Sequence, residues 1–132
     1  MIGLDTNVLV RYLVQDDPVQ AKQAARLIER RCTPDDPGCI NLIVLCETVW
    51  VLTSAYGFGR DAISDAIDQL LHAVEITVES DQTVVAALRL YRSSKIDFAD
   101  ALIAVRNQQL GCDHTATFDR EALAIPGFGA VP

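Results

Sequence analysis

The sequence predicts an α/β fold, a three-layer α/β/α sandwich with a short central parallel sheet. Short apolar stretches typical of strands alternate along the chain with longer stretches of helical periodicity. This alternation favours a parallel sheet, because two parallel strands are usually joined by a helix that packs on one face of the sheet. The chain has 132 residues, half of them hydrophobic, so we expect one domain, 1–132, with a core of its own.

The expected elements follow from apolar spacing, turn residues and helix-capping residues. Strands are expected at 1–4, 38–40, 74–78, 115–118 and 129–131. Helices are expected at 8–13, 19–31, 42–56, 59–73, 81–93 and 97–110. The helix at 42–56 is apolar almost all round, which predicts that it is buried on all sides.

Composition narrows the class of protein. The net charge of −7 argues against broad affinity for nucleic acid, but it leaves room for clustered acids whose charge a metal would offset. The four cysteines form no Cys-x-x-Cys pair, and His72 and His114 stand in no zinc-like spacing with them, so reduced structural thiols are expected. No apolar run is long enough to span a membrane and no signal-like segment opens the chain, so we expect a soluble cytoplasmic protein.

Two acids in the first half of the chain are candidates for chemistry. Asp5 follows the first strand and precedes a helix, the place where open α/β sheets carry their sites; alternatively, Asp5 or Thr6 only caps that helix. Glu47 lies in the apolar stretch 42–56, and a buried carboxylate is normally paired, protonated or bound to metal. The alternatives for Glu47 are an ion pair with a distant arginine and an exposed edge of the helix.

Three more acids lie in the second half. Asp97 is expected as an N-cap, and Asp100 as a first-turn residue on an inward face shared with Ile103 and Ala104. Asp97 can lie on the same side of the helix and border the site. Asp119 follows the expected strand at 115–118.

Four of these acids, Asp5, Glu47, Asp100 and Asp119, should meet at one edge of the sheet, because parallel strands present their carboxyl ends there. So many carboxylates do not all stay ionised without a cation, and hard oxygen ligands favour Mg²⁺ or Mn²⁺. The chemistry that such a site supports is metal-assisted attack of water on a phosphodiester, with Asp100 or Asp119 orienting the water. Basic residues that could steer the backbone of a phosphodiester substrate are Arg11, Arg89, Arg92 and Lys95.

The order of these motifs resembles a known family. Asp-Thr-Asn at the start, Glu in an apolar helix, Asp-Ala-Leu-Ile-Ala in a later helix and then Thr-x-Asp look like a PIN domain, and length and layout are similar to VapC-type toxins of toxin–antitoxin pairs. The resemblance implies an endoribonuclease that uses Mg²⁺ or Mn²⁺. It places the metal-site acids at Asp5, Glu47, Asp100 and Asp119 and supporting polar groups at Thr6, Asn7 and Thr117, with a looser match at Asp97.

The resemblance also implies a cognate antitoxin whose segment blocks the site, and a homodimer. Three alternatives stay open: a solitary PIN nuclease, an acidic module that only binds a metal or a partner, and a receiver-type signalling domain. A receiver needs paired acids after its first strand, where Leu4 precedes Asp5, and a lysine after its last strand, where none follows Lys95. Metal-dependent RNA cleavage that is lost on changing one acid separates the nuclease from the binding module.

Overall fold

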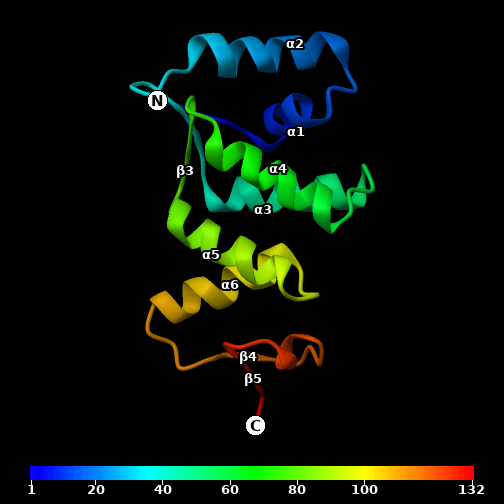
Figure 1. Ribbon diagram of the computed structural model, residues 1–132, viewed down its shortest axis with the longest axis vertical. Helices are drawn as coiled ribbons and strands as arrows, with labels where there is room; N and C mark the ends of the chain where they lie inside the picture. The colour runs from blue at the N-terminus through cyan, green and yellow to red at the C-terminus, as the bar shows by residue number, and fades with distance from the viewer. The chain divides into compact units, whose positions relative to one another are not determined.

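The computed structural model describes residues 1–132, which divide into a first unit, Met1–Asp81, and a second unit, Gln82–Pro132 (Figure 1). Strands alternate with helices in the expected order, so the α/β class is confirmed. The prediction of a single domain over 1–132 stays a prediction. None of the helices is long and apolar enough to cross a membrane.

The sheet of the first unit contains β1 (Ile2–Gly3), β2 (Gly38–Ile40) and β3 (Ile76–Val78) in that spatial order, and both pairings are parallel. Gly38 lies opposite Ile2 and Ile76. A Cβ atom at Gly38 would stand 2.8 Å from Cδ1 of Leu4, so the absence of a side chain lets Leu4 pack directly against β2.

The helices of the first unit begin within two residues of the expected positions. They are α1 (Thr6–Val14), α2 (Pro18–Arg26) with its π-helical extension (Leu27–Arg31), α3 (Leu42–Ser54) and α4 (Arg60–His72). The Asp17 side chain accepts from the backbone N–H groups of Val19 and Gln20, and Pro18 occupies the first turn of α2. Helix α1 packs against both α2 and α3 (Figure 1).

The expectation that α3 is buried on all sides is wrong. Leu45 and Leu52 are buried, whereas Ile43 is 73% exposed and Trp50 is 70% exposed. Residues three, four or seven positions apart share a helix face, so Ile43 and Trp50 lie together on the side that the first unit leaves uncovered. Hydropathy alone does not distinguish such a face from a buried one, because both are apolar.

The second unit contains α5 (Asp81–Arg92), α6 (Phe98–Gln109), β4 (Thr115–Thr117), a 3₁₀ turn (Ala122–Ala124) and β5 (Phe128–Ala130). The first residue of α5, Asp81, is the last residue of the first unit. The strands β4 and β5 pair in parallel and form a sheet of their own. The rings of Tyr91 and Phe98 meet edge to face with centroids 6.0 Å apart, which packs the end of α5 against the start of α6.

Candidate metal centre

In the first unit, two of the expected acids, Asp5 after β1 and Glu47 on α3, both form a hydrogen bond with Thr6. Asp5 is the N-cap of α1, and its Oδ1 accepts from the backbone N–H of Thr6 at 2.8 Å. The Thr6 hydroxyl donates to Oε1 of Glu47 at 3.2 Å. Thr6 therefore links the capping acid Asp5 to Glu47, and its supporting role at a metal site stays a prediction.

The expectation that Glu47 is a buried charge is wrong. Its side chain is exposed, because α3 turns Leu45, Thr48 and Leu52 toward the core instead. None of the ion pairs of the first unit includes Glu47. Of the three interpretations, the exposed edge of the helix is the one that the structure bears out, so burial no longer argues for a metal at this residue.

In the second unit, three acids interact electrostatically; we call Asp97, Asp100 and Asp119 the acid cluster. Asp97 stands at the N-cap position of α6, but its side chain makes no capping hydrogen bond. Asp100 follows in the first turn, half-buried, and Asp119 stands two residues beyond β4. Burial raises the pKa of Asp100, and the neighbouring carboxylates Asp97 and Asp119 raise it further.

The surroundings of the acid cluster differ from expectation in one respect. Ala104 shares the Asp100 face and is buried, but Ile103 is 47% exposed, so the inward face is narrower than predicted. The Thr117 hydroxyl accepts from the backbone N–H of Asp119 at 3.0 Å, and its supporting role at a metal site stays a prediction. The Asp119 carboxylate itself accepts from the backbone N–H of Glu121.

The predicted site residues are divided between the units. Asp5, Thr6, Asn7 and Glu47 belong to the first unit, and Asp97, Asp100, Thr117 and Asp119 to the second. Neither unit by itself gathers three or more His, Cys, Asp or Glu side chains closely enough to hold a metal ion. The convergence of the four metal-site acids stays a prediction.

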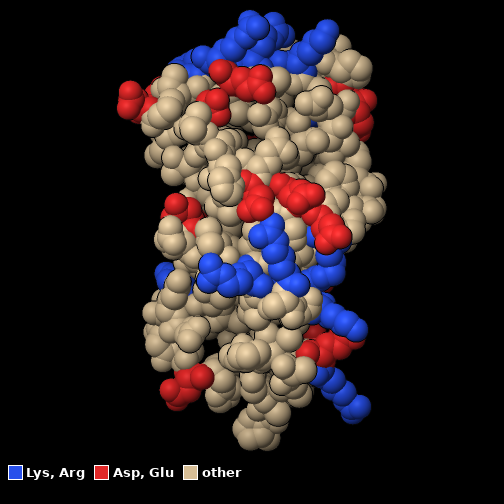
Figure 2. Space-filling view, in the orientation of Figure 1, with Lys and Arg blue, Asp and Glu red and all other residues tan.

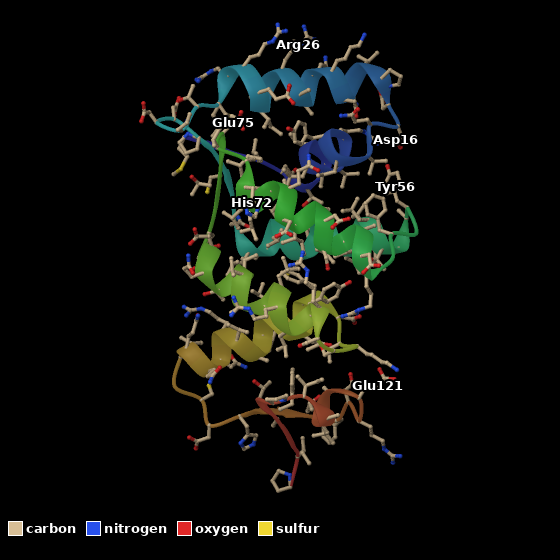
Figure 3. The ribbon with its side chains drawn as sticks, in the orientation of Figure 1. Asp16, Arg26, Tyr56, His72, Glu75 and Glu121 are labelled. Atoms are coloured by element: carbon tan, nitrogen blue, oxygen red, sulfur yellow. The ribbon has the colours of Figure 1, made fainter.

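The predicted RNA-steering residues have different surroundings. Arg11 pairs with Asp16 at 3.1 Å and donates to Gln20 and to the Tyr56 hydroxyl, which in turn donates to Asp16. Asp16 and Tyr56 are labelled in Figure 3. The hydrogen bond from Tyr56 is the main reason that the pKa of Asp16 is lowered. Arg11 is thus held by three side chains of the first unit, and Arg89, Arg92 and Lys95 are exposed residues of the second unit.

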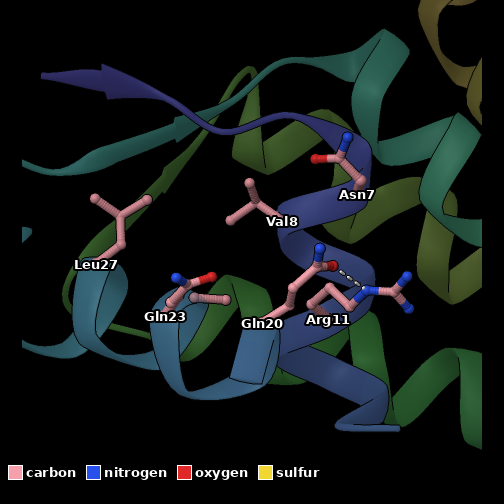
Figure 4. A pocket seen from close by; sticks show the side chains of 7 residues that line it. Asn7, Val8, Arg11, Gln20, Gln23 and Leu27 are labelled. Carbon is pink, nitrogen blue, oxygen red and sulfur yellow. Dashed lines mark hydrogen bonds between the residues drawn. The ribbon is translucent and has the colours of Figure 1, made fainter. Parts of the chain in front are cut away.

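A feature that sequence reasoning missed is a cavity of about 500 Å³ between α1 and α2 (Figure 4). It is lined by Asn7, Val8, Arg11, Gln20, Gln23, Ala24 and Leu27. The signal available in the sequence was the pair of glutamines on α2, three residues apart and therefore on one helix face.

Comparison with known proteins defines the class. The sequence model of the PIN domain family matches residues 2–127, nearly the whole chain. The protein therefore belongs to the PIN domain family. It is also similar to a VapC ribonuclease of Aquifex aeolicus (strain VF5), with 23% identity over 117 residues that cover 89% of this chain and 86% of that relative. The predicted family is confirmed, and the receiver-type alternative is excluded.

Proposed function

We propose that this protein is a metal-dependent endoribonuclease that hydrolyses RNA phosphodiesters, and that it is the toxin of a VapBC-type pair. The observation that carries the proposal is the acid cluster, in which burial and the carboxylates Asp97 and Asp119 raise the pKa of Asp100. Ionising a carboxylate beside two others costs free energy, and a bound cation lowers that cost. Family membership supplies the nuclease class, and the similarity to a VapC ribonuclease supports RNA as substrate.

The donor set fits Mg²⁺ or Mn²⁺. The candidate ligands Asp5, Glu47, Asp100 and Asp119 all offer carboxylate oxygens, and these two ions prefer oxygen. An ion bound there supplies a water of lowered pKa and neutralises charge on the phosphate. The residues of this chain would do the rest: Thr6 holds Glu47 through its hydroxyl, and Asp100 or Asp119 accepts a hydrogen bond from the attacking water.

The products of cleavage test this proposal. Direct attack of water on phosphorus does not need the RNA 2′-hydroxyl, so cleavage should leave a 5′-phosphate and a 3′-hydroxyl. The measurement is digestion of a structured RNA with Mg²⁺ or Mn²⁺, followed by analysis of both ends. A 2′,3′-cyclic phosphate, or full activity in EDTA, would overturn the proposal.

The folded protein should also gain stability from the ion. Binding to the folded state alone stabilises it by about 2.7 kcal/mol at about 100 times the Kd. For a chain of this size that raises the Tm by several degrees. Thermal scans in EDTA and in excess Mn²⁺ measure this shift in Tm. The variant Asp113→Asn lacks an exposed acid outside the acid cluster and should show the same shift in Tm. Equal melting temperatures at saturating Mn²⁺ would count heavily against the metal centre.

We further propose that the protein acts in the cytoplasm as a homodimer with a cognate antitoxin whose segment blocks the site. The exposed Ile43 and Trp50 on α3 support a protein contact, because large apolar side chains grouped at a surface often mark one. A neighbouring small gene for a DNA-binding protein that binds this chain and stops RNA cleavage would support the pair. Its absence would favour a solitary PIN nuclease.

A further inference from the structure

The cavity between α1 and α2 combines an apolar wall with side-chain amides. Val8, Ala24 and Leu27 form the apolar part, and Asn7, Gln20 and Gln23 contribute amides (Figure 4). A volume of about 500 Å³ lies within the range of pockets that bind small molecules. Such a lining suits a flat, largely apolar group with hydrogen-bonding edges.

The amides are available to a ligand. Oε1 of Gln20 accepts from Nε of Arg11 at 2.7 Å, which fixes the orientation of that amide and leaves its NH₂ group without a partner. The side chains of Asn7 and Gln23 form no hydrogen bond within the protein. Each free amide offers two donor hydrogens and a carbonyl acceptor, the combination that pairs with the edge of a nucleobase.

The cavity adjoins the candidate metal centre. Asn7 lines it and stands two residues after Asp5, directly after Thr6, at the start of α1. A group in the cavity is therefore close to whatever binds at Asp5.

One wall of the cavity borders a strongly basic surface. Figure 2 shows basic side chains gathered over α2 and its extension. We call them the basic face; its exposed residues are Lys22, Arg26, Arg30 and Arg31. Gln23 is three residues from Arg26, so a cavity-lining amide and an unpaired guanidinium are neighbours on the helix. In Figure 3, Arg26 points outward from α2. Only Arg31 of the four forms an ion pair, with Asp36.

We propose that this cavity binds one unpaired nucleobase of the RNA substrate, near the phosphate that is cut, while Lys22, Arg26 and Arg30 contact neighbouring phosphates. This inference rests on the proposed ribonuclease function and assigns that function a specificity pocket. Sequence-specific recognition of RNA reads the edges of unstacked bases, which amides beside an apolar wall can do. A protein of net charge −7 that gathers cations beside this cavity favours a polyanion as occupant.

Binding is tested without catalysis. In EDTA, a five-nucleotide single-stranded RNA is titrated into ¹⁵N-labelled protein, alongside the same RNA with an abasic site at each position in turn. The side-chain amide signals of Gln20 and Gln23 should shift with the intact RNA, and one abasic position should remove most of that shift. Equal shifts with all abasic strands would overturn the proposal, as would shifts caused by an acidic peptide and not by RNA.

Specificity is tested by substitution. Gln23→Leu keeps the bulk of the side chain and removes its amide, so the base preference at one position near the cut should fall by roughly tenfold in a pool of RNAs with randomised loops. Gln69→Leu makes the same change on the exposed surface of α4, away from the cavity, and should leave the preference unchanged. Arg26→Gln should weaken binding of all sequences alike and reduce its dependence on salt.

The outcomes separate this proposal from the ribonuclease proposal. If Gln23→Leu cuts the pool with the wild-type base preference, the nucleobase pocket is wrong and the ribonuclease stands. If no RNA is cut with Mn²⁺ while base-dependent shifts persist in EDTA, the ribonuclease is wrong and the pocket stands.

Discussion

Asp100→Asn should abolish RNA cleavage while the protein remains folded. An amide is a weak ligand for Mg²⁺ and cannot balance its charge, and Asp100 is the acid whose surroundings raise its pKa. Loss of a group that merely supports a metal ligand costs roughly 10–100-fold, so loss of a ligand should reduce kcat/KM by at least about 100-fold. Cleavage rates of one RNA at several Mn²⁺ concentrations measure the loss, and circular dichroism checks the fold.

The same variant should be more stable than the wild type in EDTA at neutral pH. Because burial, Asp97 and Asp119 raise the pKa of Asp100, the folded state holds that proton more tightly than the unfolded chain does. The wild type therefore loses stability as the pH rises from the ordinary value of 3.8 through the raised pKa. Asparagine does not titrate, so the difference in Tm should grow across that window and then stay constant to neutral pH.

The matched control for the cleavage measurement is Asp113→Asn, an exposed acid in the same unit. It should retain wild-type cleavage, because Asp113 lies outside the acid cluster. Full activity of Asp100→Asn would remove that residue from the site and shift attention to Asp97, whose carboxylate makes no capping hydrogen bond at the start of α6.

Local patterns were sufficient to predict the elements. Asp5 was offered as a cap of the first helix from its position alone, because a cap acts through a contact of its own side chain with the next few residues. Strand positions were equally local: 38–40 was predicted to the residue. The acids Asp5 and Asp119 follow from the same reasoning, since each stands just after a strand.

Exposure was harder to predict than secondary structure. Helix α3 has no polar stripe, so its sequence does not indicate which apolar residues face the core of the first unit and which, like Ile43 and Trp50, do not. The inward position assigned to Glu47 failed for the same reason. The cavity between α1 and α2 was also beyond reach, because it depends on how two helices pack and not on the pattern within either.

Glu47→Gln should separate a metal ligand from a structural residue. The side chain is exposed and accepts one hydrogen bond, from the Thr6 hydroxyl at 3.2 Å, which the glutamine carbonyl can still accept. The free energy of unfolding in EDTA should therefore change by no more than about 0.5 kcal/mol. RNA cleavage should nevertheless fall by at least about 100-fold, since the neutral amide cannot balance the charge of the ion.

Urea denaturation of the purified variants in EDTA measures the free energy of unfolding, and RNA cleavage with Mn²⁺ measures the activity. Glu29→Gln is a closely matched control, because Glu29 is also exposed on a helical segment and accepts one hydroxyl hydrogen bond, from Tyr12 at 3.3 Å. It should lose neither stability nor activity. A loss of stability well above about 0.5 kcal/mol, or wild-type cleavage by Glu47→Gln, would remove Glu47 from the metal centre.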